Sequence, residues 1–136
     1  MKATLTQASA VAGILGLSWF FASGAYGASV DEAALRTDPE RGALLYESRC
    51  SVCHSLDANR IGPKHQGIHG RRAGGVEGFD YSPALRASGV VWRDDTLNRW
   101  LENPQGFIPG QRMNIRVSKA KDRADIIAYL KQQSGG

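Results

Sequence analysis

The chain has few sulfur-bearing residues, and this shortage narrows its chemistry. Its 136 residues include two cysteines and two methionines, one of which is Met1. Both cysteines, Cys50 and Cys53, lie in one short segment. A disulfide between them would close only a tiny loop, so it would stabilise the fold little. The role of the cysteines is therefore better sought in the local motif than in cross-linking.

The chain also lacks a large excess of charge. Seventeen basic and thirteen acidic residues give a net charge of +4. This bias is far short of a nucleic-acid-binding tract, so we expect no nucleic-acid partner, but it suits docking to an acidic protein face. The length and the 42% apolar share are sufficient for one small domain, without room for a second core.

No charged residue occurs between Lys2 and Asp31. One basic residue, an apolar stretch and small residues before Ala28 predict a secretory signal over residues 1–27, followed by a flexible lead-in at 28–37. Export would place the mature protein in the periplasm. The stretch is also close to the roughly 20 residues that span a bilayer. An uncleaved anchor, holding the protein at the inner membrane facing the periplasm, is therefore the alternative; a buried core helix is a third interpretation.

The most informative segment runs from Cys50 to His54, two thiols separated by two residues and followed directly by histidine. This spacing is the attachment pattern of c-type haem: two thioethers form at one porphyrin edge, and His54 offers its imidazole to the iron. A thiol–disulfide catalyst and a zinc site are the competing hypotheses. The first would need a βαβ setting, and the second lacks an obvious fourth ligand.

Helix signals flank long irregular stretches. Asp38 and Pro39 predict a helix start, with the helix reaching about Cys50. Gly42 within it is costly and suggests close approach by another helix. Three further helices are predicted over residues 83–88, 94–103 and 118–132, the second stopped by Pro104 and the last capped by Ser118. We expect Leu97, Trp100 and Leu101 to form one buried face, and Ile126, Tyr129 and Leu130, flanked by Ile127, to form another.

The stretch from Ser55 to Phe79 has little periodicity and many glycines. A structureless loop of this length is unusual in a small domain unless it packs on a large cofactor. Arg71 and Arg72 lie in this loop, and one of them is a candidate for pairing with an anionic haem propionate. The loop therefore favours a haem site independently of the cysteines.

The second axial position of the iron has several candidates. Met113 is the one methionine beyond the signal segment, and it lies in a loop after Pro109-Gly110. His65 and His69 follow His54 closely, which makes the opposite face of the haem awkward to reach. An open position would instead favour gas binding or peroxidase chemistry.

From about Asp38 to Gln132 the chain resembles class I cytochrome c, most closely the mitochondrial type and its alpha-proteobacterial relatives. The resemblance rests on the haem motif together with segments in the family's order: Arg41-Gly42, Ile61-Gly62-Pro63, Gly67-Ile68-His69-Gly70-Arg71, Gly78-Phe79-Asp80-Tyr81, Val91-Trp92, Leu101-Glu102-Asn103-Pro104, Ile108-Pro109-Gly110-Gln111-Arg112-Met113 and Ala124-Asp125-Ile126-Ile127-Ala128-Tyr129-Leu130. It implies an all-α domain over residues 38–136, with three to four helices and long loops wrapped around one covalent haem c.

The resemblance also implies roles for individual residues. Cys50 and Cys53 would form the thioethers, His54 would be the proximal ligand and Met113 the distal one. The carbonyl of Pro63 would orient His54. The remaining implied residues are Arg71, Tyr81 and Trp92 at the propionates, Trp100 near the methionine, Gly42 and Tyr46 at a crossing with the last helix, and Arg49 and Arg112 at the docking rim.

The implied function is that of a monomeric one-electron carrier and not an enzyme. Its partners would be redox proteins with acidic docking faces: a cytochrome bc-type complex, a terminal oxidase, a dehydrogenase or a photosynthetic reaction centre, in a respiratory or photosynthetic chain. Contact with a membrane would come only through the uncleaved N-terminus or through such partners. The alternative is a dedicated electron-acceptor subunit of one periplasmic dehydrogenase or oxidase.

Four positions depart from the family pattern. Trp100 replaces a frequent tyrosine, Leu85 an asparagine, Gln111 a threonine and His65 a leucine. An indole N–H donates a hydrogen bond but does not accept one, so the polar contacts near the iron ligand are expected to differ.

Overall fold

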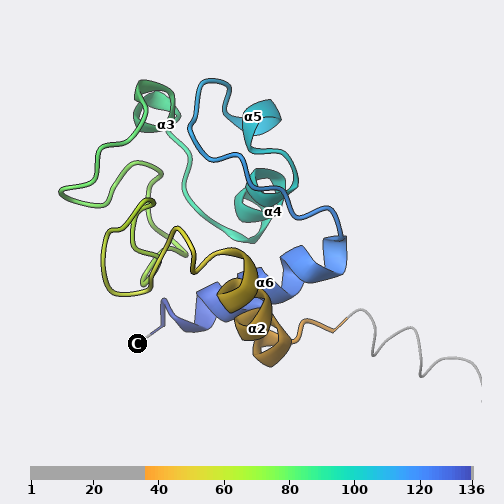
Figure 1. Ribbon diagram of the computed structural model, residues 1–136. Helices are drawn as coiled ribbons and strands as arrows, with labels where there is room; N and C mark the ends of the chain where they lie inside the picture. Colours follow the sequence, from red (N-terminus) through yellow and green to blue (C-terminus); the bar gives the residue numbers. More distant parts are fainter. Residues whose placement is uncertain (1–35, 136) are drawn as a thin grey trace, which may run out of the picture.

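The structure is a computed structural model that describes residues 36–135. The predicted signal over 1–27 and most of the lead-in at 28–37 lie outside the described residues. Within the described range the fold is all-α, as predicted, with one isolated antiparallel bridge between Arg72 and Val91. Figure 1 shows its five helices: α2 (Pro39–Arg49), α3 (Pro83–Ala87), α4 (Asp94–Glu102), α5 (Pro104–Phe107) and α6 (Ala120–Gln132). None of the described helices is long and apolar enough to cross a bilayer.

Helix α2 begins and ends where its sequence signals predict. The Asp38 carboxylate caps the helix by accepting a hydrogen bond from the backbone N–H of Arg41 at 2.9 Å, and Pro39 occupies the first turn. Cys50 is the C-terminal cap, and its N–H still donates to the Tyr46 carbonyl. The haem-type motif therefore begins directly at the end of a helix, where the backbone position is well defined.

Helices α2 and α6 pack across each other at one side of the molecule (Figure 1). Gly42 lies at the closest point: a Cβ there would come within 2.0 Å of the Asp125 carbonyl oxygen and 3.0 Å of Tyr129 Cβ. The close approach inferred from this helical glycine is confirmed. The rings of Tyr46 and Tyr129 meet beside it with centroids 5.3 Å apart.

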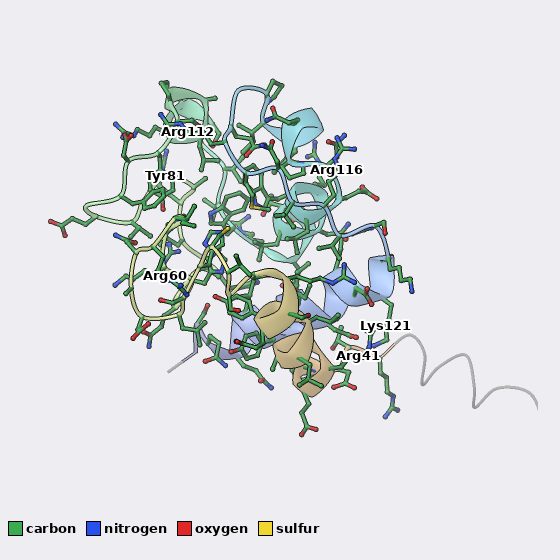
Figure 2. The ribbon with its side chains drawn as sticks, in the orientation of Figure 1. Arg41, Arg60, Tyr81, Arg112, Arg116 and Lys121 are labelled. Carbon is green, nitrogen blue, oxygen red and sulfur yellow. The ribbon has the colours of Figure 1, made fainter. Side chains whose placement is uncertain are left out.

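An ion-pair cluster joins the same two helices. The Arg41 guanidinium bridges the carboxylates of Asp122 and Asp125, which are buried, and Lys121 Nζ reaches Asp125 at 2.6 Å. Figure 2 shows Arg41 and Lys121 side by side at this edge of the molecule. Because the carboxylates are enclosed, they need these partners to offset the loss of water.

Helix α4 presents the predicted apolar face, since Leu97, Trp100 and Leu101 are all buried. The expectation that Pro104 ends helical structure is only partly right. Helix α4 ends at Glu102, but Pro104 then begins the short helix α5, and the Asn103 side chain caps it by accepting from Gly106 N–H at 3.2 Å. Proline lacks only an N–H that a first-turn position would leave free, so the same residue can stop one helix and start the next.

Two details of α6 correct the sequence interpretation. Lys119, not Ser118, is the N-cap, and it makes no side-chain cap hydrogen bond; the Ser118 carbonyl instead accepts from Arg123 at 2.8 Å. Ile126 and Leu130 are buried as expected, but Ile127 is buried too, whereas Tyr129 is half-buried. The buried face is wider because α6 packs against α4 as well as α2.

The long glycine-rich loop has no regular secondary structure but is tied to distant segments. Gly67 N–H donates to the Gln133 carbonyl at 3.2 Å, Gly70 N–H to the Trp92 carbonyl at 2.7 Å, and Ala73 N–H to the Val90 carbonyl at 2.8 Å. Gly70 adopts a φ of 91°, which favours glycine. These bonds fix the path of the loop at separate points and leave a hollow behind it.

Candidate functional site

A cavity of about 560 Å³ lies between the loops, α4 and α6. This volume is in the range of cofactor pockets, roughly 300–1,000 Å³. Its walls are mainly apolar and include Ile68, Leu97, Leu101, Ile126 and Leu130. The residues expected to act on a cofactor also line it: Cys50, Cys53, His54, Pro63, Arg71, Tyr81, Trp92, Trp100 and Met113, with Arg49 and Arg112. The fold thus gathers residues from across the described sequence around one hollow.

The cysteine motif forms a tight turn that continues the end of α2. The N–H groups of Cys53 and His54 both donate to the Cys50 carbonyl, at 3.1 and 2.9 Å. Both thiols are free and both face the cavity. Burial raises the pKa of the Cys50 thiol to about 11, so it is protonated at neutral pH. A protonated thiol is a poor redox nucleophile, which counts against Cys50 as the attacking thiol of a thiol–disulfide catalyst.

His54 is held in one orientation by the adjoining loop. Its Nδ1 lies 2.8 Å from the Pro63 carbonyl oxygen; since a carbonyl only accepts, Nδ1–H is the donor and Nε2 keeps its lone pair. Burial lowers the pKa of His54, which favours this neutral form. Gly62 is needed beside the ring, because a Cβ there would lie 2.1 Å from His54 Cε1. A neutral, fixed imidazole is what binding of a metal ion requires.

The two other histidines of the chain lie in different settings. The His65 ring stacks on His54, with centroids 3.9 Å apart and planes inclined by 21°. Its Nδ1 is buried without a hydrogen-bond partner, as is the nearby Tyr46 hydroxyl. His69 is turned away from the cavity and contacts Asp94, with Nε2 to Oδ1 at 2.7 Å. Neither ring faces His54 across the cavity, since one is stacked on it and the other is outside.

Aromatic side chains and one arginine form another wall. Tyr81, Trp92 and Trp100 are buried, and the two indoles meet with centroids 5.2 Å apart. Arg71 faces the cavity, whereas Arg72 is exposed and outside its lining, which separates the two candidate arginines. The Arg71 guanidinium donates to the Gln66 and Lys64 carbonyls at 2.9 and 2.8 Å. Its charge is thereby held at the cavity by the loop's own backbone.

The rim of the cavity combines apolar and charged side chains. Val52, Ile61 and Ile115 line the cavity yet are 68%, 77% and 47% exposed, which places them at its mouth. Sequence analysis did not identify these three; single exposed apolar residues in loops give no periodic signal. Arg112 Nη1 pairs with the exposed Asp80 carboxylate at 3.2 Å. The Arg49 guanidinium pairs with the Asp122 carboxylate, with Nη2 to Oδ2 at 3.6 Å. Figure 2 shows Arg60, Tyr81 and Arg112 together on the loop side, away from Arg41 and Lys121.

The residues of the cavity fit a covalently attached haem c. Two free thiols lie beside an oriented neutral imidazole, the walls are mainly apolar, and Arg71, held by loop carbonyls, supplies positive charge for acidic groups. Among the described residues no group of three or more His, Cys, Asp or Glu side chains is arranged to hold a bare metal ion. A zinc site is therefore unsupported, and haem is the group that matches this donor set.

Comparison with known proteins gives the same result. The family model "Cytochrome c" matches residues 39–134. The chain is 46% identical over 101 residues to cytochrome c of Gibberella zeae, covering 71% of this chain and 95% of that one. It is 41% identical over 109 residues to cytochrome c of Arabidopsis thaliana, covering 77% and 97%. Among solved structures it is similar to cytochrome cH from Methylobacterium extorquens, with a TM-score of 0.67, 37% identity and coverage of 70% and 98%.

Proposed function

This chain belongs to the cytochrome c family and is an electron-transfer protein with one covalent haem c, and from that premise we propose that His54 and Met113 bind the haem iron. The observation that carries the proposal is the shared cavity. It is lined by both cysteine thiols, by a His54 ring whose Nδ1 is engaged by Pro63, and by Met113 from the loop between α5 and α6.

Each residue has a defined task in this proposal. When bound, the haem supplies a one-electron ferric/ferrous couple. Cys50 and Cys53 hold it through thioethers, His54 offers Nε2 to the iron, and Met113 offers its thioether sulfur, a soft neutral donor that raises the reduction potential relative to a second imidazole. Apolar walls exclude water, so little has to rearrange when an electron arrives or leaves.

The part of the cavity lined by Arg71, Tyr81 and Trp92 is proposed to receive the propionate groups of the haem. Arg71 has its guanidinium fixed by two backbone carbonyls, and Tyr81 and Trp92 can donate from the O–H and the indole N–H. Burial raises the pKa of Tyr81, so its hydroxyl stays protonated and remains a donor. Trp100 packs against Trp92 and lines the same cavity as Met113.

A spectrum of the purified full chain tests the ligand assignment. Covalent attachment predicts sharp c-type bands in the reduced protein that remain with the polypeptide after extraction with acidified acetone. Methionine ligation predicts a weak charge-transfer band in the far red for the oxidised protein, which Met113→Ala should abolish while lowering the potential. A Met113→Ala protein that keeps the band would contradict the assignment of Met113.

We further propose that the cavity mouth is where redox partners dock. Val52, Ile61 and Ile115 provide an exposed apolar contact, and Arg49 and Arg112 add positive charge around it, which suits an acidic partner face. Reduction by a soluble acidic donor should slow as ionic strength rises. Co-purification with one dehydrogenase or oxidase at high salt would instead favour a dedicated subunit.

The N-terminal assignments remain part of the proposal. Residues 1–27 are proposed as an export signal, 28–37 as a lead-in and 38–136 as the cytochrome c domain, with the mature protein in the periplasm. The support is the uncharged stretch between Lys2 and Asp31 and the small residues before Ala28. N-terminal sequencing of the mature protein decides between cleavage near Ala28 and an intact anchor that begins at Met1.

A further inference from the structure

Gln111 is a buried polar side chain with an unusual pair of partners. Only 4% of it is exposed, so both ends of its amide need hydrogen bonds. Nε2 donates to the Met113 carbonyl at 2.6 Å, and Oε1 accepts from the Met113 backbone N–H. The Gln111 side-chain amide thus pairs with both the backbone N–H and the backbone C=O of Met113.

A second glutamine supports the first. Gln105 lies in α5, and its Nε2 donates to the Gln111 carbonyl at 3.0 Å, while its Oε1 accepts from Gly110 N–H at 3.4 Å. The Gln111 backbone also donates to the Ile108 carbonyl at 3.3 Å. The hydrogen bonds therefore run from helix α5 through Gln105 and Gln111 to the backbone of Met113.

These bonds matter because the segment around Met113 has no helix or strand to fix it. Residues 108–119 form an irregular connection between α5 and α6. In such a segment, backbone groups without partners would exchange freely with water and the loop could open locally. The Gln111 amide satisfies the donor and the acceptor of Met113, the residue in this loop that is proposed to reach the iron.

We propose that Gln111, braced by Gln105, is a positioning residue that holds the Met113 backbone so that its sulfur resists displacement from the iron by other ligands. The inference deepens the proposed function and rests on Met113 being an axial ligand. It assigns a role to a position where the family commonly has threonine, whose short side chain has one hydroxyl in place of a two-ended amide.

Imidazole added to the oxidised holoprotein tests the inference, since it competes with the Met113 sulfur for the iron. Gln111→Leu keeps a side chain of similar size but removes both hydrogen bonds. We therefore expect imidazole to bind about tenfold more tightly. Gln105→Leu acts one step further away, and about threefold tighter binding is expected. Gln132→Leu, at an exposed position of α6, is the matched control and should leave the affinity unchanged.

Hydrogen exchange supplies a readout that does not depend on the iron. The Met113 amide should exchange about tenfold faster in Gln111→Leu, because its acceptor is lost. The Ile126 amide, in the buried part of α6, should exchange at the wild-type rate. Equal acceleration at both amides would indicate general destabilisation and would overturn the positioning role. If Gln111→Leu does not fold, Gln105→Leu gives the same two measurements.

Met113→Ala separates failure of this inference from failure of the ligand assignment. If Met113→Ala strengthens imidazole binding while Gln111→Leu stays within twofold of wild type, Met113 is the ligand and the positioning role is wrong. If Met113→Ala leaves imidazole affinity unchanged, the ligand assignment fails and the role of Gln111 fails with it. Graded effects in the order Met113→Ala, Gln111→Leu, Gln105→Leu support the inference.

Discussion

The two sides of this molecule are held together by different means. At the crossing of α2 and α6, protein packs on protein: Gly42 lets the backbones meet, and Arg41 bridges two buried carboxylates. Around the cavity, loops are joined by separate backbone hydrogen bonds and enclose a hollow of about 560 Å³. At the crossing the contacts are all between protein groups, whereas the loop side encloses space that a cofactor is expected to fill. Stability and redox function should therefore respond to different substitutions.

The largest effect should come from preventing haem attachment. In a Cys50→Ala, Cys53→Ala double variant the loops lose the surface on which they are expected to pack, so the opening free energy of their amides should fall toward zero. Ala73, in the loop, should lose far more hydrogen-exchange protection than Ile126, at the crossing. Equal protection of Ala73 in the variant and in wild type would show that the loop side needs no cofactor.

A methyl group at the crossing should be the next most damaging change. Gly42→Ala places a Cβ 2.0 Å from the Asp125 carbonyl oxygen, so the helices must separate. We expect the free energy of unfolding to fall by about 3 kcal/mol. Denaturation by guanidinium measures this, and Gly135→Ala, where an added Cβ meets no neighbouring atom, is the control. The far-red band of the folded Gly42→Ala protein should be unchanged, because the site lies on the other side.

Acid should loosen the crossing through Asp125. Burial raises the pKa of Asp125, but hydrogen bonds from Lys121, the Asp38 backbone and Arg41 outweigh it, so the net pKa is lowered from 3.8. A carboxylate whose pKa is lowered by folding stabilises the folded state at pH values above its unfolded-state pKa. This contribution is lost as the pH falls from about 3.8 through the folded-state pKa.

Asp125→Asn removes this titration. We expect a loss of about 2 kcal/mol at neutral pH, from weakened charged hydrogen bonds, and a shallower fall of stability in acid. Guanidinium denaturation across the acid range measures both. Asp94→Asn, at an exposed carboxylate paired with Lys131, is the control and should change stability by less than 1 kcal/mol. An acid slope as steep as that of wild type in Asp125→Asn would place the responsible groups elsewhere.

The smallest effect concerns the rim of the cavity. Asp80 pairs with both Arg112 and Arg86, with ion-pair distances of 3.2 and 2.7 Å, and offsets part of their positive charge. Asp80→Asn should free this positive charge and raise the association rate with an acidic donor by about twofold at low salt, an effect that disappears at high salt. Stopped-flow reduction measures the rate. Unchanged association at low salt would mean that partners dock away from Arg112, and unfolding should be unaffected in either case.

The sequence predicted the parts of the fold that depend on local signals. The helix start at Asp38 and Pro39 and the apolar face of Leu97 and Trp100 each depend on residues close in sequence, and the structure has both. Gly42 was also interpretable, because a glycine inside a helix needs a reason and close packing is the usual one. The haem motif was recognisable because its chemistry fixes the spacing of thiols and imidazole.

What the sequence could not predict depends on tertiary contacts. Asp122, Asp125 and Arg123 resemble the solvated face of an amphipathic helix, yet all three are buried, because α2 and α4 supply charged and polar partners. The hydrogen bonds of Gln111 to Met113 span two residues of irregular backbone, for which no periodic pattern exists. Helix α5 was missed because Pro104 signals an end and a start equally well.

The crossing of α2 with α6 also bears on the order in which the chain can fold. The two helices stand near opposite ends of the described sequence, so their contact closes a loop that contains almost the whole domain. When the chain emerges with its N-terminus first, Cys50 and Cys53 are exposed well before α6 is available. The thiols are thus accessible while the protein is still open, and docking of the last helix can follow as the step that buries the finished site.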